Sequence, residues 1–482
     1  MHDPTVLERS QAPKVDGLAN GKLTVLSLGE DPPPAIQGTL ERIAGLPFVE
    51  SVLALPDVHW KEQMEVPSSI AVTTRDVIVP EFTSVAVNDG MGIVRTGLVA
   101  SDVSPERLRR FFTAVNAHAA AHFFDTNRYS ISLPELRGLV IDGARALLGR
   151  YELDSSVLAC MEDGGCVPSI GDEGESLAEV VPLQLMTRFS RSEMGLNFGG
   201  NHFLEVQVVD QVLAPEVASR WGFATGEVVV MYHLGPGPFG GTLLNHFSRR
   251  IKLPPARVPL FFASKLLFHY VQRMGLGRSS KKWGIHFRHN GWTPLPADSD
   301  EGRLLRGAMR MAINFGYGYR LATMRAIRDG LHEAISPQLN VNPFCDISHN
   351  GAVEELSPQG YSWVARHNAC RMEPEKPTIV AGAHDVPSYL GIGGEGMGGR
   401  LTSYDHGAGH LIDRYREANR LAPVEGRVTR LRMTRGRDAK IVSDHDIPLL
   451  SAEPIDRLME CLENNGIMRP VVRLRPIGNL KN

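Results

Sequence analysis

Cysteine is scarce in this chain of 482 residues, and the five that occur follow no ligand pattern. They are scattered, odd in number and without a CxxC pair. A disulfide framework or a cysteine-based structural zinc site is therefore not expected. Unpaired thiols are typical of a reducing compartment, so we expect the protein to be cytoplasmic.

Long hydrophobic runs are missing as well. The start, Met1-His2-Asp3-Pro4, has neither the basic nor the apolar region of a signal peptide. The most apolar segments, such as residues 258–263, are too short to cross a bilayer. We therefore expect a soluble protein that does not associate with a membrane.

A strong charge of either sign is also absent, since the formal net charge is −3. This value gives no sign of a nucleic-acid binder, although a local basic groove would be sufficient for one. Residues 427–440 form such a local group, with six basic residues and a single acid. Alternation over residues 427–432 predicts a strand with one basic face. That face would suit a polyanion backbone, and would equally suit a charged edge strand that resists aggregation.

Glycine and proline are abundant, with 48 and 32 residues, which predicts a loop-rich α+β fold. No linker divides the chain, so we expect one large domain over residues 1–482. Helices are predicted at 34–43, 105–122 and 299–335. Gly316 and Gly318 are expected to loosen or break the last helix. Strands are predicted at 52–55, 77–87, 203–209, 228–231 and in part of 379–393.

Turns and loops are predicted where these strands end. Pro56 is expected to stop the first strand, leaving Asp57 and His59 just beyond it. Two glycines in residues 88–92 predict a tight turn beside a ligand. The acidic, glycine-rich residues 150–180 are expected to form a surface loop.

Five of the 17 histidines share one local pattern, because each ends a strand or lies beside glycines. A metal ion needs neutral imidazoles that project from rigid elements, and with carboxylates such a set suits manganese, iron or zinc. The alternative is that each of the five is packed or in a turn for its own reason. The five are His59, His202, His233, His349 and His406.

A second histidine pattern carries less weight. His118 and His122 have the i, i+4 spacing of metal ligands on a helix. Their surroundings are rich in alanine and contain no nearby glutamate, which favours an ordinary helix face.

Nine glycines between residues 382 and 409 indicate anion binding, because backbone N–H groups freed by glycine form anion-binding nests. No GKS or GKT follows, so this is not a Walker loop. Residues 393–400 would also suit a flexible surface loop. Within this region His406 is followed by Gly407-Ala408-Gly409, which exposes the imidazole. Because histidine titrates near neutral pH, His406 is a candidate acid, base, nucleophile or ligand.

Taken in order, these motifs resemble the RtcB-type RNA ligases, a GTP- and manganese-dependent family. The similarity covers nearly the whole chain, and the combination of motifs is specific although no single one is. The matching stretches are Leu55-Pro56-Asp57-Val58-His59-Trp60, Gly200-Asn201-His202-Phe203-Leu204-Glu205-Val206, Asp346-Ile347-Ser348-His349-Asn350, His406-Gly407-Ala408-Gly409, residues 469–478 and Lys481.

The resemblance implies a fold with central β-sheets surrounded by helices, and an RNA ligase or RNA-end repair enzyme. In it, His406 would attack GTP, carry GMP, and pass the GMP to an RNA 3′-phosphate, formed where needed from a 2′,3′-cyclic phosphate. A 5′-hydroxyl end would then seal the strand. The resemblance leaves room for an activating protein, and we expect a monomer.

Ligand roles follow from the same resemblance, with GTP and one or two Mn²⁺ ions as cofactors. Metal ligation falls on His202, His233 and His349, together with Asn88 and Met91. The nucleotide-binding residues are expected to be Asn201, His202, Phe203, Leu204, Glu205, His349, Asn350, Ala381, Gly382, Ala383, His384, Ser388, His406, Gly407, Ala408, Gly409 and Lys481.

The sequence departs from the family pattern at the metal site and at phosphate contacts. Asn88 and Met91 stand where the family has an Asp-x-x-Cys pair, and Asp89 is one residue out of register. Pro236-Gly237 replaces a Ser-Arg, residues 365–368 replace His-Arg-Lys-Gly, and His410 replaces an arginine. Two alternatives therefore stay open, a non-ligating paralogue that binds RNA ends or guanine nucleotide, and a metal-dependent phosphatase or cyclic phosphodiesterase.

Overall fold

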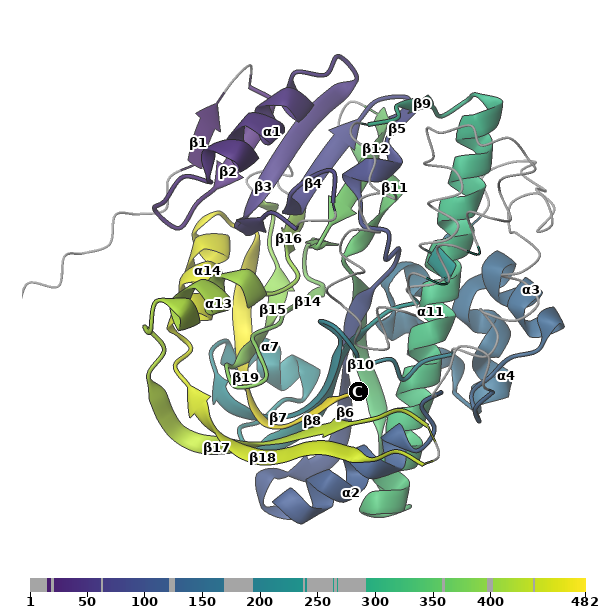
Figure 1. Ribbon diagram of the computed structural model, residues 1–482, viewed down its shortest axis with the longest axis vertical. Coiled ribbons are helices and arrows are strands. Elements are labelled where there is room, and N and C mark those ends of the chain that lie inside the picture. The colour runs from purple at the N-terminus through teal and green to yellow at the C-terminus, as the bar shows by residue number, and fades with distance from the viewer. Residues whose placement is uncertain are drawn as a thin grey trace, which may run out of the picture.

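Two β-sheets and a long helix, α11 (Asp300–Ala334), frame the molecule in the computed structural model (Figure 1). The structure describes residues 15–18, 21–61, 64–120, 126–168, 194–236, 239–240, 263, 267, 292–357, 360–396, 402–436 and 438–482. Helices and strands in comparable amounts confirm the expected α+β class. Within the described part, no helix is both long and apolar enough to cross a membrane.

The first sheet has six strands in the order β1-β2-β3-β4-β12-β11. Helix α1 (Pro34–Ala44) connects the parallel strands β2 and β3, and confirms the helix expected over residues 34–43. It starts at a proline, which suits the first helical turn, and buries Ile36, Leu40 and Ile43 at helical spacing. The strands are β1 (Val15–Leu18), β2 (Leu23–Leu26), β3 (Val49–His59), β4 (Ser68–Thr74), β11 (Asn350–Ser357) and β12 (Gly360–His367).

Strand β3 runs through Pro56, so the expected stop at this proline is wrong. The pairing of β3 with β4 shifts register between Ala54 and His59. Pro56 lies in this irregular part, where the ladder does not need the N–H that proline lacks. Asp57 and His59 are therefore strand residues rather than turn residues.

The second sheet has nine strands, and β19 lies at its centre. Seven follow the order β10-β6-β8-β7-β19-β15-β14, while β17 runs parallel to the end of β19 and pairs with β18. The strands are β6 (Gly90–Val99), β7 (Phe203–Val212), β8 (Glu227–Leu234), β10 (Asn342–Ser348), β14 (Pro377–Val380), β15 (Ser388–Gly393), β17 (Pro423–Met433), β18 (Ile441–Leu450) and β19 (Met468–Lys481).

Two expectations for residues 77–92 are wrong. The predicted strand is only β5 (Val77–Ile78), followed by the 3₁₀ turn η1 (Pro80–Phe82), because the apolar side chains there pack into the core without a ladder. Gly90 and Gly92 lie inside β6 rather than in a turn. A Cβ on Gly92 would lie 2.1 Å from the Tyr232 hydroxyl oxygen, so close approach of a buried side chain requires glycine.

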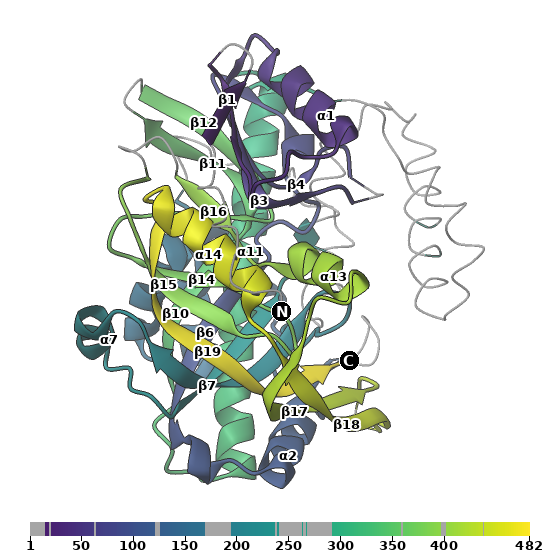
Figure 2. The same cartoon turned by 90° about the vertical axis from the view of Figure 1, so that its left-hand side faces the viewer.

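The second sheet divides two hydrophobic cores, and strand alternation assigns side chains to them. On β8, Val228, Val230 and Tyr232 point to the core shared with α11, whereas Val229 and Met231 point to the other core. That second core is covered by α7 (Pro215–Trp221), α13 (Gly409–Glu417) and α14 (Glu453–Asn464), of which α13 and α14 lie together in Figure 2.

Helix α11 is continuous over 35 residues, so the expected break at Gly316 and Gly318 is wrong. Both glycines are buried contact points. A Cβ on Gly316 would lie 2.7 Å from the Asn88 side chain, and one on Gly318 would lie 2.3 Å from Leu139. Tertiary packing overrides the low helix propensity of glycine here.

The remaining helices border this frame. Helix α2 (Pro105–Asn116) ends earlier than expected, so His118 lies beyond it, and His122 is outside the described residues. In the expected loop 150–180, residues 155–165 form the 3₁₀ turns η4 (Ser155–Cys160) and η5 (Glu162–Gly165). The other elements are η2 (Ala100–Asp102), α3 (Leu133–Asp142), η3 (Gly143–Leu147), α4 (Leu148–Tyr151), β9 (Leu295–Pro296), β13 (Ala369–Arg371) and β16 (Ser403–Asp405).

Candidate functional site

Four histidines from segments far apart in the sequence lie together. The Nε2 atoms of His233 and His349 are 3.3 Å apart. The ring of His406 stacks on that of His349 at a centroid distance of 4.6 Å, and the His202 ring lies 5.4 Å from that of His233. Ligand atoms of His233, His349 and His406 all lie within 4.8 Å of one another, which is close enough to hold a metal ion. His59 stacks instead on His410.

Sheet geometry explains where two of these side chains point. His233 follows Val229 and Met231 at alternating positions of β8, so it shares their face of the sheet. His349 lies between β10 and β11, where its backbone N–H donates to the Asp89 carbonyl oxygen at 3.0 Å. Its own carbonyl oxygen accepts from the Ala369 N–H at 3.0 Å. The histidine is therefore held from both sides.

The loop that carries His406 is pinned by backbone contacts with Ala381. The Ala381 N–H donates to the His406 carbonyl oxygen at 3.0 Å, and the Ala408 N–H donates to the Ala381 carbonyl oxygen at 2.9 Å. A Cβ on Gly407 would lie 2.8 Å from that carbonyl oxygen, so glycine permits the contact. His406 Nδ1 lies 3.0 Å from the Asn368 carbonyl oxygen. Because a carbonyl only accepts, Nδ1 carries the proton and Nε2 keeps its lone pair.

Asp57 caps the helix that follows this loop. Its Oδ1 accepts from the Leu411 N–H at 2.7 Å and its Oδ2 from the His410 N–H at 3.3 Å, at the start of α13. A carboxylate at a helix N-terminus satisfies free N–H groups and interacts favourably with the helix dipole. The Asp57 N–H in turn donates to Asp405 Oδ1 at 3.3 Å. Burial raises the pKa of Asp57 to about 7.

The imidazoles of His233, His349 and His406 are neutral at pH 7. Burial lowers the pKa of His233 and His349 well below the usual value. Burial and the nearby Lys61 ammonium lower the pKa of His406 to about 3. Metal ligation and nucleophilic attack both need the unprotonated ring. His349 Nδ1 is buried and has no hydrogen-bond partner among the described residues, so this nitrogen is available to bind a ligand.

A carboxylate completes the donor set. Asp89 Oδ2 lies 3.1 Å from His202 Nε2, and Asp89 Oδ1 is buried without a partner in the described part of the chain. Asn88, one residue earlier, has the left-handed φ of 59° and donates from Nδ2 to the Ile313 carbonyl oxygen at 2.5 Å. Imidazole and carboxylate donors fit Mn²⁺. Met91 is fully buried and pairs across the sheet with His233.

A second polar group extends from the cluster along the second sheet. Glu205 accepts from Asn479 Nδ2 and from Gln207 Nε2, both at 2.9 Å, and burial raises its pKa to about 8. Gln207 also donates to the Ser388 hydroxyl oxygen at 3.2 Å, and this oxygen accepts from the Gly382 N–H. The chain of contacts joins β7 and β19 to the segment that pins His406.

The last strand ends at this group. Lys481 donates from Nζ to the His202 carbonyl oxygen at 2.5 Å and to the Gly200 carbonyl oxygen at 2.8 Å. Burial lowers its pKa to about 8. The structure thus brings the first, middle and last of the sequence motifs into one region.

The other predicted nucleotide residues divide by burial. Asn201 is exposed, and Phe203, Ala383 and His384 are half-buried. Leu204 and Ala408 belong to the two hydrophobic cores, so only their backbones are available. The Asn350 side-chain oxygen accepts from the Asn368 N–H at 2.8 Å, which supports the turn bonded to His406.

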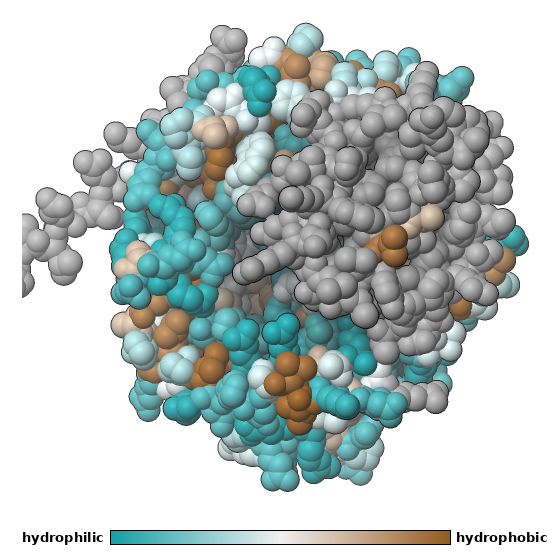
Figure 3. Space-filling view, in the orientation of Figure 1, coloured by the Kyte–Doolittle hydropathy of each residue, from teal (hydrophilic) through white to brown (hydrophobic). Residues whose placement is uncertain are grey.

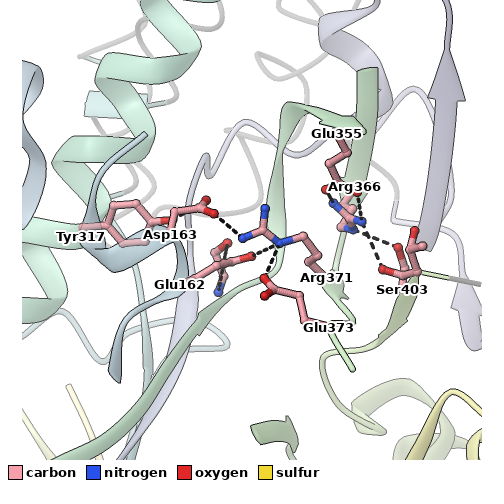
Figure 4. A network of polar contacts seen from close by, with 10 residues as sticks. Glu162, Asp163, Tyr317, Glu355, Arg366, Arg371, Glu373 and Ser403 are labelled. Carbon is pink, nitrogen blue, oxygen red and sulfur yellow. Dashed lines mark hydrogen bonds and ion pairs between the residues drawn. The ribbon is translucent and has the colours of Figure 1, made fainter. Parts of the chain in front are cut away.

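Sequence reasoning missed an ion network behind the cluster (Figure 4). Arg371 lies between Glu162, at 3.3 Å, and Asp163 and Glu373. Glu162 accepts from the backbone N–H of Ser348, the neighbour of His349, at 2.9 Å. The network therefore supports the strand that carries His349.

A second arginine in the same view supports the other histidine. Arg366 pairs with Glu355 and donates to the Ser403 hydroxyl oxygen at 2.9 Å, three residues before His406. The only sequence signal for this part was the departure from the family pattern at residues 365–368. The partly buried Lys61, which acts on His406, gave no such signal.

Comparison with known proteins relates this chain to a protein family. The sequence profile described as tRNA-splicing ligase RtcB matches residues 39–482. A Thermococcus kodakarensis protein named tRNA-splicing ligase RtcB is 23% identical over 478 residues, covering 92% of this chain and 91% of that protein. A Mycobacterium tuberculosis protein named RNA-splicing ligase RtcB is 25% identical over 471 residues, covering 91% and 99%.

A third relative is longer. The Pyrococcus horikoshii protein named tRNA-splicing ligase RtcB is 25% identical over 423 residues, which are 82% of this chain and 44% of that protein. The chain thus spans less than half the length of this relative. The chain belongs to the RtcB family, since the family profile covers almost all of it. This confirms the family resemblance of the motifs and their order.

Proposed function

We propose that the protein is an RNA ligase or RNA-end repair enzyme that works through a His406–GMP intermediate. It would join RNA ends bearing a 2′,3′-cyclic phosphate or 3′-phosphate to 5′-hydroxyl ends. The observation that carries this proposal is the state of His406. Its Nδ1 is bonded to the Asn368 carbonyl oxygen, and its neutral Nε2 is free to act beside His233 and His349.

In the first step, His406 Nε2 attacks the α-phosphorus of GTP. The nitrogen–phosphorus bond forms as the bond to the bridging oxygen breaks, and pyrophosphate leaves. Nδ1 keeps its proton, held by the Asn368 carbonyl oxygen, so the modified ring is cationic and leaves readily in the next step. The pinned loop around Gly407 keeps the imidazole in place for attack.

The later steps use the same imidazole as leaving group. An oxygen of the RNA 3′-phosphate attacks the GMP phosphorus and releases His406. The RNA 5′-hydroxyl then attacks the activated 3′-phosphorus, GMP departs, and the new phosphodiester bond closes the strand. A 2′,3′-cyclic phosphate must first be opened by water to give the 3′-phosphate.

For metal binding we propose His202, His233 and His349, with Asn88, Met91 and Asp89 as further donors. One or two Mn²⁺ ions bound there would neutralise phosphate charge during transfer. Asn88 Oδ1 is buried without a hydrogen-bond partner in the described chain, so this oxygen is available to bind a metal ion. Burial keeps the imidazoles of His233 and His349 neutral and ready to bind.

For GTP we propose the cradle that surrounds His406 and the polar group at Glu205. Ser388, Gly382 and Lys481 join the cradle through the contacts described above. The remaining members are Asn201, His202, Phe203, Leu204, His349, Asn350, Ala381, Ala383, His384, Gly407, Ala408 and Gly409. An activating protein, a monomeric state and a cytoplasmic location remain predictions from the sequence.

Transfer of label from GTP tests this proposal directly. Purified protein is incubated with GTP labelled at the α-phosphate and with Mn²⁺, and compared with His406→Ala. The control is His118→Ala, a histidine whose ring makes an edge contact with Tyr129 and is not part of the cluster. Wild type and the control should acquire label, and His406→Ala should not. If wild type acquires none with any divalent metal ion, the proposal fails.

One observation favours a non-ligating protein as the second candidate. Met91 is fully buried opposite His233, and its thioether cannot carry the negative charge of a bridging thiolate. Binding of 3′-phosphate RNA in a gel shift without sealing would support this candidate. Recovery of sealing in the double variant Asn88→Asp, Met91→Cys would place the defect at the metal site. A phosphatase or cyclic phosphodiesterase ranks behind both, because it leaves the nucleotide cradle without a role.

A further inference from the structure

Strand β17 places two arginines on the face of the sheet that carries the candidate site. It runs parallel to the end of β19, with Arg430 opposite Asn479 and Arg432 opposite Lys481. Asn479 is in turn opposite Glu205 on β7. Paired residues of neighbouring strands share a face. Arg430 and Arg432 therefore extend the row of Lys481 and Glu205, and β17 and β18 form the outer wall beside β19 and β7 (Figure 1).

The opposite face confirms this assignment. Leu431, between the two arginines, is fully buried in the core shared with α2 and α11, as are Leu480 of β19 and Leu204 of β7. Arg430 is half-buried and Arg432 is exposed. The alternation of side chains along β17 thus gives the strand one apolar face and one face that carries the two arginines.

Two acids of β18 lie on the other face. Asp444 is opposite Leu431 and Asp446 is opposite Thr429, so both point away from the two arginines. There Arg109 of α2 pairs with Asp444 at 2.8 Å and with Asp446 at 3.2 Å. On the site face, the residues of β18 opposite Arg430 and Arg432 are His445 and Ser443, neither of which is an acid.

Within the described residues, the two guanidinium groups have no partner. Among the residues that the structure describes, neither Arg430 nor Arg432 forms an ion pair or hydrogen bond through its side chain. Asp385, whose pKa is affected by the charge of Arg430, is already paired with Arg416 at 2.8 Å. The positive charge of Arg430 reaches His384 and Lys481, where it helps to lower the pKa of each.

We propose that Arg430 and Arg432 bind successive backbone phosphates of the RNA strand whose end is presented to the His406 cluster. The proposal rests on the proposed function for its choice of RNA. Arginines that are not paired with an acid are the usual means of holding phosphates. Arg430 and Arg432 are two residues apart on a strand, so about 7 Å separates them. This separation suits two successive phosphates of a chain better than one terminal phosphate. The exposed His445 beside Arg430 offers a ring on which a base can stack.

The test compares two double variants that lose the same charge. Arg430→Gln with Arg432→Gln changes the site face. Arg109→Gln with Arg427→Gln changes the other face, since Arg109 pairs with Asp444 and Arg427 alternates with Thr429 and Leu431 on that face of β17. Binding of a fluorescent single-stranded RNA with a 3′-phosphate is measured by anisotropy over a range of salt concentrations. Labelling of His406 by GTP and the melting temperature are measured in parallel.

For the site-face variant we expect RNA binding to be about tenfold weaker at low salt. The slope of the logarithm of the binding constant against the logarithm of the salt concentration should fall by about 1.4, since each phosphate contact on a single strand contributes about 0.7. Labelling by GTP and the melting temperature should stay as in wild type, and the control variant should keep the wild-type slope. Equal slopes in all three proteins, or a wild type that binds no RNA, would overturn the proposal. So would a loss of GTP labelling as large as the loss of RNA binding, because the arginines would then hold the nucleotide.

These results separate the inference from the ligase proposal. If wild type never acquires GMP but binds RNA with a slope that depends on Arg430 and Arg432, the ligase mechanism fails and this RNA surface stands. The described surface in Figure 3 is mainly hydrophilic with hydrophobic residues in small patches, so the cations and not a broad apolar face are expected to dominate binding.

Discussion

The carboxylate of Asp89 lies 3.1 Å from Nε2 of His202, although the family resemblance led us to expect the ligand one residue earlier, at Asn88. The left-handed φ of Asn88 turns the chain at this point, and the Asn88 side chain packs on α11 near Gly316. The next residue thereby faces the histidines. A carboxyl group is thus present beside His202 although position 88 is an asparagine.

From this pair we predict that Asp89→Asn weakens Mn²⁺ binding by about tenfold or more, because even residues that only orient metal ligands change affinity by that much. The amide keeps the shape of the side chain and removes its charge. Titration with Mn²⁺, followed by the electron paramagnetic resonance signal of the free ion, gives the affinity without any turnover. Asp413→Asn, an exposed acid on α13, is the control. Equal affinities in all three proteins would show that the imidazoles alone hold the ion.

Two glycines in the loop after His406 give a matched pair of variants. A Cβ on Gly407 would lie 2.8 Å from the Ala381 carbonyl oxygen, whereas one on Gly409 would have nothing within 4 Å. We predict that Gly407→Ala slows GMP transfer about a hundredfold, since a shift of about 1 Å in a reacting group costs that much. Gly409→Ala should leave the rate within a few fold of wild type.

The measurement is the initial rate of labelling from GTP, with the melting temperature of both variants as a check on folding. Gly409→Ala should not lower the melting temperature, because replacing an unstrained glycine reduces the entropy of the unfolded chain. Two variants with the same labelling rate would mean that the Ala381 contact does not position His406.

The sequence predicted which histidines form the site, but it did not predict which polar side chains contact them. His202, His233, His349 and His406 share a local pattern of strand ends and glycines, and each could be found one at a time. Asp89 could not be assigned, because its contact with His202 depends on the φ of Asn88. Such a turn is decided by packing on α11, more than two hundred residues later in the chain.

The same reason accounts for the errors in secondary structure. Gly316 and Gly318 look like helix breakers locally, but α11 needs them because Asn88 and Leu139 pack against those positions. Pro56 looks like a strand end, but β3 continues through a shift in its pairing with β4. Local propensity was overridden in each case by a contact with a distant residue.

The buried cap of α13 should make stability depend on pH. Burial raises the pKa of Asp57 to about 7 in the folded protein, against 3.8 for the free side chain. Between these values the folded state holds a proton that the unfolded chain has released. The contribution of Asp57 to the free energy of unfolding therefore falls as pH rises from about 4 to about 7, by at most about 1.4 kcal/mol per pH unit.

Asp57→Asn keeps an oxygen to accept from the helix N-terminus and cannot titrate. We predict that the difference in free energy of unfolding between wild type and Asp57→Asn declines over this pH range and is constant above it. Urea unfolding at half-unit steps from pH 4.5 to 8 measures the difference. Glu417→Gln serves as control, because this acid lies at the end of α13 and its side chain is exposed. A constant difference over the whole range would contradict the prediction.

The partly buried Lys481 should make GTP binding depend on pH around pH 8. Burial lowers its pKa to about 8, so its ammonium is charged at pH 7 and neutral by pH 9.5. If the ammonium attracts nucleotide phosphates, the affinity for GTP must fall as pH rises through about 8. Burial raises the pKa of Glu205 to about 8 as well, so a negative charge appears nearby over the same range and adds to the fall.

Three variants separate the effect of Lys481 on GTP binding from that of Glu205. Lys481→Arg keeps its charge at every pH used, and should therefore lose the part of the fall that is due to the lysine. Glu205→Gln should lose the other part, and Lys481→Met should bind GTP weakly even at pH 7. Equilibrium binding of GTP from pH 7 to 9.5, with Mn²⁺ omitted to avoid its hydroxide, gives the four profiles. A wild-type affinity that does not change through pH 8 would exclude the Lys481 ammonium from the nucleotide site.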